Sequence, residues 1–87
     1  MDYRIEFAKS ARKELEKLPT RQRRQVADAI DTLSTNPRHE GVIKLMNTVN
    51  RYRLRADDYR IVFCIFDREV VVFIIAVDHR KDIYRKR

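Results

Sequence analysis

The sequence contains few of the residues that mark several common classes of protein. Its 87 residues include one glycine, two prolines, one cysteine and no tryptophan. A single cysteine excludes an internal disulfide framework and a metal site built from several cysteines. One glycine excludes a glycine-rich phosphate-binding loop, and no apolar run approaches the ~20 residues of a membrane-spanning helix. The first residues lack the apolar stretch of a signal peptide, so we expect a cytoplasmic protein without a membrane partner.

What the chain has in excess is positive charge. Lysine and arginine total 20 whereas aspartate and glutamate total 13, so the formal net charge is +7 at pH 7. Hydrophobic residues make up 44% of the chain, which is enough for one core, and we expect residues 1–87 to form a single domain. The charge indicates an acidic or polyanionic partner, or else it serves solubility alone. Where the cations lie along the sequence distinguishes between these interpretations.

The first half of the chain predicts one strand and two helices. Apolar and polar residues alternate over residues 3–7, as in a half-buried strand. Apolar residues then recur at helical spacing over residues 7–18, and Pro19 ends this helix. Thr20 is the expected N-cap of a second helix, which has an apolar face between residues 26 and 33 and ends at an Asn-Pro pair. The short link makes the two helices a hairpin.

The second half predicts three strands, over residues 52–56, 61–66 and 70–77. Tight turns at Asp57-Asp58 and Asp67-Arg68 would join them into an antiparallel meander. The order β-α-α-β-β-β is that of an α+β domain, in which the helical hairpin covers one face of an antiparallel sheet. Residues 79–87 are too polar for a core strand, and we expect a short tail helix or turn there.

Four arginines are prominent in this second half. Arg51, Arg53 and Arg55 fall on one face of a strand, because successive side chains alternate between faces. Arg60 begins the next strand and can lie beside them. Like charges opposed across a sheet are destabilising, so we interpret the group as a phosphate site, which suits the planar guanidinium. The alternative is a solvated strand face with two neighbouring aspartates as counter-charges.

Two residues near the C-terminus are candidate proton carriers. Histidine changes charge close to neutral pH, which singles out His79, although most surface histidines are merely solvated. Tyr84 stands among cations and could stack on a base or simply pack against the fold. His39 lies in a predicted loop, and Cys64 lies in an apolar strand, where we expect an inert core residue. The sequence shows no metal-site, cofactor-loop or paired-carboxylate signature.

Several segments of the sequence resemble the RelE/ParE toxin superfamily. Residues 52–63, YRLRADDYRIVF, resemble its Y-R-[IL]-R-x-G-x-Y-R-[LIV]-[IVL]-[YF] motif. Residues 77–84, VDHRKDIY, resemble its V-G-H-R-x-x-[IV]-Y ending, and residues 3–18 and 43–45 fit its opening and the approach to the arginine strand. The resemblance covers essentially the whole chain. It implies the RelE/ParE-like, microbial-RNase-like fold and the toxin half of a type II toxin–antitoxin pair.

The resemblance also implies site residues. RelE-type members are mRNA interferases, endoribonucleases that cut mRNA in the ribosomal A site, whereas ParE-type members inhibit DNA gyrase. Carried over position by position, the catalytic residues of the RelE type match Arg51, Arg53, Arg60, Arg80 and Tyr84. We add His79 to these as a proton carrier. The further cations expected to bind RNA are Lys44, Arg55, Lys81, Arg85, Lys86 and Arg87.

The chain departs from the family pattern at the arginine strand. Arg51 and Arg53 stand where the best-studied RelE branch has lysine. Arginine stays charged, so both can hold a phosphate but cannot take a proton, and that step falls to Tyr84 or His79. An aspartate also replaces a common turn glycine, which alters the turn and not the chemistry.

We expect cleavage by attack of a ribose 2′-OH on the adjacent phosphorus, without a metal or any other cofactor. The expected partners are the ribosome, its mRNA and a small acidic or amphipathic antitoxin. Two alternatives stay open, a ParE-like gyrase inhibitor without nuclease activity and a basic RNA-binding module without catalysis. The histidine, arginine and tyrosine near the C-terminus favour the nuclease.

Overall fold

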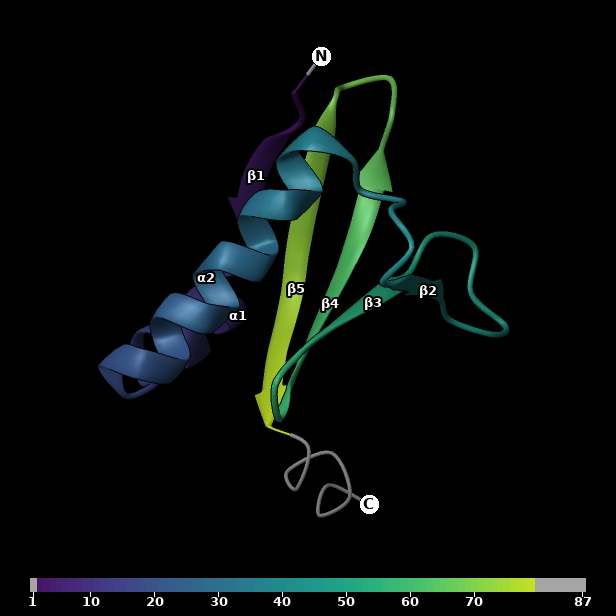
Figure 1. Cartoon of the computed structure of the whole chain (residues 1–87). Coiled ribbons are helices and arrows are strands. Elements are labelled where there is room, and N and C mark those ends of the chain that lie inside the picture. Colours follow the sequence, from purple (N-terminus) through teal and green to yellow (C-terminus); the bar gives the residue numbers. More distant parts are fainter. Residues whose placement is uncertain (1, 80–87) are drawn as a thin grey trace.

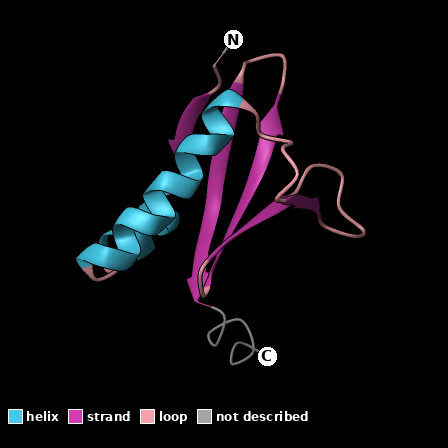
Figure 2. Cartoon of the chain, viewed as in Figure 1, coloured by secondary structure: helices cyan, strands magenta, loops and turns pink. Residues whose placement is uncertain are grey.

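The computed structural model describes residues 2–79, which form two helices and five strands (Figure 1). In chain order these are β1 (Arg4–Phe7), α1 (Lys9–Glu16), α2 (Thr20–Thr35), β2 (Val42–Lys44), β3 (Tyr52–Ala56), β4 (Tyr59–Phe66) and β5 (Val71–His79). The helices come before the last four strands along the chain. Figure 2 shows the helices lying beside the strands rather than alternating with them, so the predicted α+β class is confirmed. The tail predicted as a helix or turn lies, from residue 80 onward, outside the described residues.

The strands form one sheet in the order β1-β5-β4-β3-β2. Strands β2 to β5 pair antiparallel, which confirms the predicted meander. Strand β1 joins parallel to β5, with Arg4 opposite Val71, so the sheet is mixed and the prediction of a purely antiparallel sheet is wrong for β1. Strand β2 was not predicted, because three residues are too few to show an alternating pattern.

Both helices pack on one face of this sheet, and the hydrophobic core lies between them. Ala11 of α1 and Leu33 of α2 are fully buried against the sheet. On β4, Ile61 and Phe63 are fully buried and face the helices, and the residues between them turn to the other face. We call that second face the outer face. Because the helices cover only one side, polar side chains have room on the outer face.

The predicted limits of the second helix are correct at one end. Its C-cap is Asn36, directly before a proline, as expected. Its N-cap is Pro19, and Thr20 is already helical, so the predicted threonine cap is wrong. Neither helix has a side-chain cap hydrogen bond. Within residues 2–79, neither helix is long and apolar enough to cross a membrane.

The two tight turns of the meander differ. Asp57-Asp58 joins β3 to β4 as predicted, and Asp57 has a positive φ of 57°, which aspartate tolerates better than most residues. The link between β4 and β5 is longer than the expected pair, because Val70 belongs to it and also has a φ of 57°. A β-branched residue in this conformation is strained. The carbonyl of Val70 accepts the amide of Arg4 at 2.9 Å, which anchors the start of β1.

A hydrogen-bonded cluster holds that end of the sheet. Arg38 donates from both terminal nitrogens to the two carboxylate oxygens of Asp67, at 2.9 and 2.8 Å. The hydroxyl of Tyr3 donates to the same carboxylate at 2.7 Å. The hydrogen bonds from Arg38 and Tyr3 lower the pKa of Asp67 to about 2. The cluster ties the chain start, the segment after α2 and the β4–β5 turn together.

Candidate nucleic-acid interface

Strand β3 sends its arginines to the outer face. Leu54 and Ala56 are buried in the core, so the alternating Arg53 and Arg55 point away from the helices. Arg53 is half-buried and Arg55 is exposed. Arg51 lies just before the strand and is also exposed. The predicted one-sided placement therefore holds for the two arginines within the strand.

Arg60 completes this group from the neighbouring strand. In the sheet register, Arg60 of β4 lies directly opposite Arg55 of β3. Its other neighbour, across β4 and β5, is Asp78. Arg55 of β3, Arg60 of β4 and Asp78 of β5 therefore lie side by side on the outer face. Two guanidinium groups in a direct cross-strand pair are unfavourable for folding on their own, and they suit an anion that bridges them.

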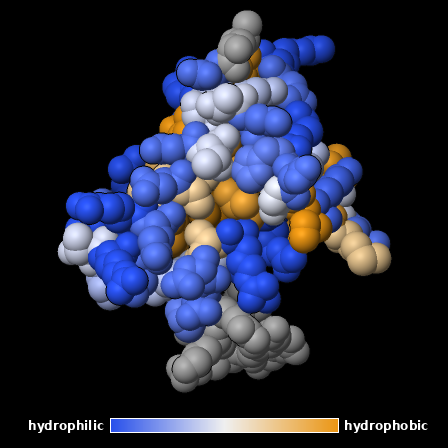
Figure 3. Space-filling view, in the orientation of Figure 1, coloured by the Kyte–Doolittle hydropathy of each residue, from blue (hydrophilic) through white to orange (hydrophobic). Residues whose placement is uncertain are grey.

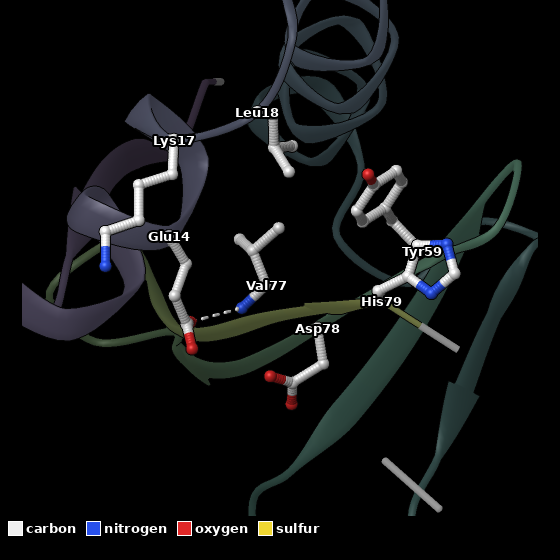
Figure 4. Close-up of a pocket in the computed structure, with 7 residues that line it drawn as sticks. All are labelled: Glu14, Lys17, Leu18, Tyr59, Val77, Asp78 and His79. Carbon is white, nitrogen blue, oxygen red and sulfur yellow. Dashed lines mark hydrogen bonds between the residues drawn. The ribbon is translucent and has the colours of Figure 1, made fainter. Parts of the chain in front are cut away.

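His79 lies on the opposite face from these arginines. It is the register partner of Tyr59, and the two rings meet edge to face with centroids 5.0 Å apart. Both line a cavity of about 370 Å³ on the helix side, together with Glu14, Lys17, Leu18, Val77 and Asp78 (Figure 4). The carboxylate of Glu14 accepts the amide of Val77 at 3.1 Å, which joins α1 to β5 at this cavity. The sheet therefore separates the His79 ring from the arginine group.

Lys44 is also not part of the arginine group. Its register partner is Tyr52, which shares a face with the buried Leu54, whereas Ile43 is opposite Arg53 on the outer face. The remaining predicted residues lie outside the described part of the chain. They are Arg80, Lys81, Tyr84, Arg85, Lys86 and Arg87.

Two features of the outer face were missed in the sequence. Asp78 had no assigned role, although β5 continues through it to His79 and places it beside Arg60. Cys64 is not a core residue, because it is opposite Phe73 on the outer face and is half-buried with a free thiol. The alternation of buried Phe63 and Ile65 around Cys64 is the signal that could have placed it.

Apolar side chains reach the surface next to the arginines. Ile43, Met46 and Val49 are 52%, 86% and 93% exposed, and they lie on β2 and in the loop that follows it. Figure 3 shows apolar side chains at the surface on the β2 side of the molecule, while hydrophilic side chains cover the helices. Ile43 connects this apolar surface to Arg53 through the sheet register.

The family assignment follows from the match to a family described as the ParE toxin of the type II toxin–antitoxin system parDE, which covers residues 5–84. The chain belongs to the RelE/ParE toxin superfamily. It is 36% identical to the toxin RelG of Mycobacterium tuberculosis, over 99% of this chain and 100% of that protein. It is 33% identical to the mRNA interferase toxin RelE of Escherichia coli, over 93% of this chain and 86% of that protein.

Solved structures of the RelE/ParE superfamily share the fold. The toxin of the RelBE2 toxin–antitoxin complex from M. tuberculosis aligns with a TM-score of 0.81 at 32% identity, covering 92% of this chain and 100% of the other. The isolated RelE toxin of E. coli aligns with a TM-score of 0.80 at 31% identity, covering 97% and 93%. The protein is thus a RelE-like toxin of a toxin–antitoxin system, as the resemblance in its motifs implied.

Proposed function

We propose that this RelE-like toxin is a ribosome-dependent endoribonuclease that cleaves mRNA in the A site. The observation that carries the proposal is the direct pairing of Arg55 with Arg60 on the outer face, with Arg53 on the same face. Two arginines held opposite each other in the sheet suit a phosphate, which can accept hydrogen bonds from both guanidinium groups. The similarity to a protein named mRNA interferase toxin supports RNA as the source of that phosphate.

The proposed reaction is an internal transfer. The ribose 2′-oxygen forms a bond to the adjacent phosphorus as the bond to the 5′-oxygen breaks. The products are a 2′,3′-cyclic phosphate and a 5′-hydroxyl end. Arg51, Arg53 and Arg60 would bind the phosphoryl oxygens, where charge builds up in the transition state, and such electrostatic stabilisation is usually the largest catalytic contribution.

We assign removal of the 2′-OH proton to a residue near the C-terminus rather than to the arginines. Arginine keeps its proton at any physiological pH, so it can stabilise charge but cannot act as a base. His79 packs on Tyr59 on the helix side, so we assign removal of the 2′-OH proton to Tyr84. Arg80 would stabilise the leaving 5′-oxygen, which takes its proton from water. The remaining tail cations, Lys81, Arg85, Lys86 and Arg87, would bind flanking phosphates.

The ribosome and an antitoxin are the proposed partners. The ribosome would hold the mRNA in a geometry ready for in-line attack, which supplies orientation that so small a protein cannot. Relatives of this chain are known from RelE–RelB complexes. We infer a small antitoxin that is acidic where it meets the arginines and apolar where it covers Ile43, Met46 and Val49. Binding there would cover the outer face and block RNA.

The test is mRNA cleavage in a translating extract, with the end groups of the products determined. We expect cuts with 5′-hydroxyl ends that persist in EDTA, and strong losses for Arg80→Ala and Tyr84→Ala. Arg68→Ala, at the β4–β5 turn, is the matched control and should cut like the wild type. If both tail variants cut as well as the wild type, the assigned roles are wrong.

Gyrase inhibition is the second candidate, because the matching family is described by its ParE toxin. A supercoiling assay separates the two functions. Inhibition of gyrase without mRNA cuts would replace the nuclease. Binding of free RNA with neither activity would indicate an RNA-binding module.

A further inference from the structure

The side chain of Asn50 forms an unusual pair of hydrogen bonds with the backbone of β4. Its Nδ2 donates to the carbonyl of Ile65 at 2.8 Å, and its Oδ1 accepts the amide of Ile65 at 3.0 Å. Both bonds are partly buried. Together they satisfy both backbone groups of one residue in the sheet, which is the role a neighbouring strand normally has.

The register explains why this residue makes these bonds. Tyr52 is opposite Phe63, so an antiparallel strand continued backwards would place residue 50 opposite Ile65. Strand β3 begins only at Tyr52. The side-chain amide of Asn50 therefore makes the two hydrogen bonds to Ile65 that the backbone of residue 50 would make if β3 extended that far. These bonds hold the chain against the edge of β4.

Arg51 lies between Asn50, whose hydrogen bonds to Ile65 we call the clamp, and Tyr52, the first residue of β3. Its carbonyl accepts the amide of Leu45 at 2.8 Å. The hydroxyl of Thr48 donates to the carbonyl of Leu45 at 2.8 Å, which ties the loop to the same point. The backbone of Arg51 is thus fixed on both sides, while its side chain is exposed.

We propose that Asn50 is a positioning residue for Arg51, acting through the backbone to aim the guanidinium at the scissile phosphate. The inference rests on the nuclease function proposed above and adds a residue to it. Electrostatic catalysis requires groups that are fixed before charge develops. Arg51, unlike Arg53, lies before the strand, so its backbone is held by Asn50 on one side and by the Leu45 hydrogen bond on the other. An amide is the side chain for this role, because it presents one donor and one acceptor side by side as a peptide group does. Aspartate lacks the donor and leucine lacks both.

The experiment is single-turnover cleavage of mRNA on purified ribosomes, with Asn50→Ala, Arg51→Ala and the double variant. We expect Asn50→Ala to slow cleavage at saturating toxin by roughly 10- to 100-fold, the scale of a small misplacement of a catalytic group. The toxin concentration for half-maximal rate should stay within about 2-fold, because the other cations still bind. In the Arg51→Ala background, Asn50→Ala should slow the reaction by less than about 2-fold, since the two residues act as one unit.

Equal slowing by Asn50→Ala in both backgrounds would overturn the proposal, because a purely structural role would not depend on Arg51. Thr32→Ala is the matched control. It removes a hydroxyl near the C-terminal end of α2 that donates to the carbonyl of Ala29 and contacts His39, and it should leave the single-turnover rate unchanged.

A second measurement separates this inference from the proposed function. If the wild-type toxin cuts no mRNA, the nuclease function fails, and backbone ¹⁵N relaxation then tests the clamp without activity. The Arg51 amide should lose order in Asn50→Ala and keep it in Thr32→Ala. An Arg51 amide that is equally ordered in all three proteins overturns the positioning role.

Discussion

The two ends of the meander carry charge in opposite ways. At the β4–β5 turn, Asp67 receives hydrogen bonds from Arg38 and Tyr3, so each charge meets its complement. At the β3–β4 turn, Arg55 is opposite Arg60, so like charges are brought together. The first end fastens three distant segments of the chain, whereas at the second Arg60 lies between Arg55 and Asp78, and we expect the two arginines to bind an anion. The difference separates the part of the molecule that maintains the fold from the part that we expect to act on RNA.

The largest expected effect comes from removing Arg60, the arginine of β4 next to the β3–β4 turn. Arg60→Ala should lower the rate of mRNA cleavage by roughly 10²- to 10³-fold, because it deletes a charge that stabilises the transition state. The melting temperature should change little. Cleavage assays and thermal unfolding of the same samples check both parts. Arg68→Ala controls for loss of a positive charge, and equal cleavage by the two variants would remove Arg60 from the site.

Removing the charge of Asp67, at the β4–β5 turn, should lower stability and leave cleavage unchanged. Asp67→Asn keeps the shape of the side chain and loses the charge that Arg38 and Tyr3 bind. We expect the melting temperature to fall by several degrees and cleavage to stay unchanged below that transition. Asp58→Asn, in the other turn, is the control and should leave the melting temperature nearly constant. A cleavage defect in Asp67→Asn with normal stability would break the division between the two ends.

The same cluster predicts how stability depends on pH. Hydrogen bonds from Arg38 and Tyr3 lower the pKa of Asp67 from 3.8 to about 2 in the folded state. A lowered folded pKa stabilises the protein above the unfolded value, and this stabilisation is lost as the pH falls toward the folded value. The difference in melting temperature between wild type and Asp67→Asn should therefore be constant above about pH 4 and shrink toward pH 2. A difference that stays constant down to pH 2 would show that the charge contributes nothing.

The smallest expected effect is a gain in stability. Arg55→Gln removes one of the two opposed guanidinium groups and keeps a polar side chain. The free energy of unfolding should rise by about 0.2–1 kcal/mol, the usual scale of a cross-strand pair, and RNA cleavage should weaken. Denaturant titration measures the change, with Arg68→Gln as the control. A loss of stability would mean that Arg55 and Arg60 are not in conflict.

Local patterns predicted the elements that carry the arginines. The alternation around Leu54 and Ala56 in β3 fixes which side the arginines take, and the turn at Asp57 fixes Arg60 as their neighbour. The parallel pairing of β1 with β5 was not predictable, because nothing near Arg4 specifies a partner as distant as Val71.

The placement of His79 shows how a small error in a strand boundary changes a site. Ending the last strand at residue 77 left His79 in a tail that could turn toward the arginines. Strand β5 runs through His79, and adjacent strand residues point to opposite faces. Because β5 includes residues 78 and 79, Asp78 lies beside Arg60 and His79 lies beside Tyr59 on the opposite face. Sequence periodicity identifies strands well but places their last residues poorly. A site at the end of a strand depends on where those last residues point.

The pairing of β1 with β5 also bears on how the toxin is made. The first strand to leave the ribosome can complete its hydrogen bonds only after the last described strand has followed, because Arg4 to Phe7 pair with Val71 to Ile74. Contacts between such distant positions make folding slow relative to local contacts. We therefore expect the nascent toxin to lack a finished sheet until β5 has been synthesised.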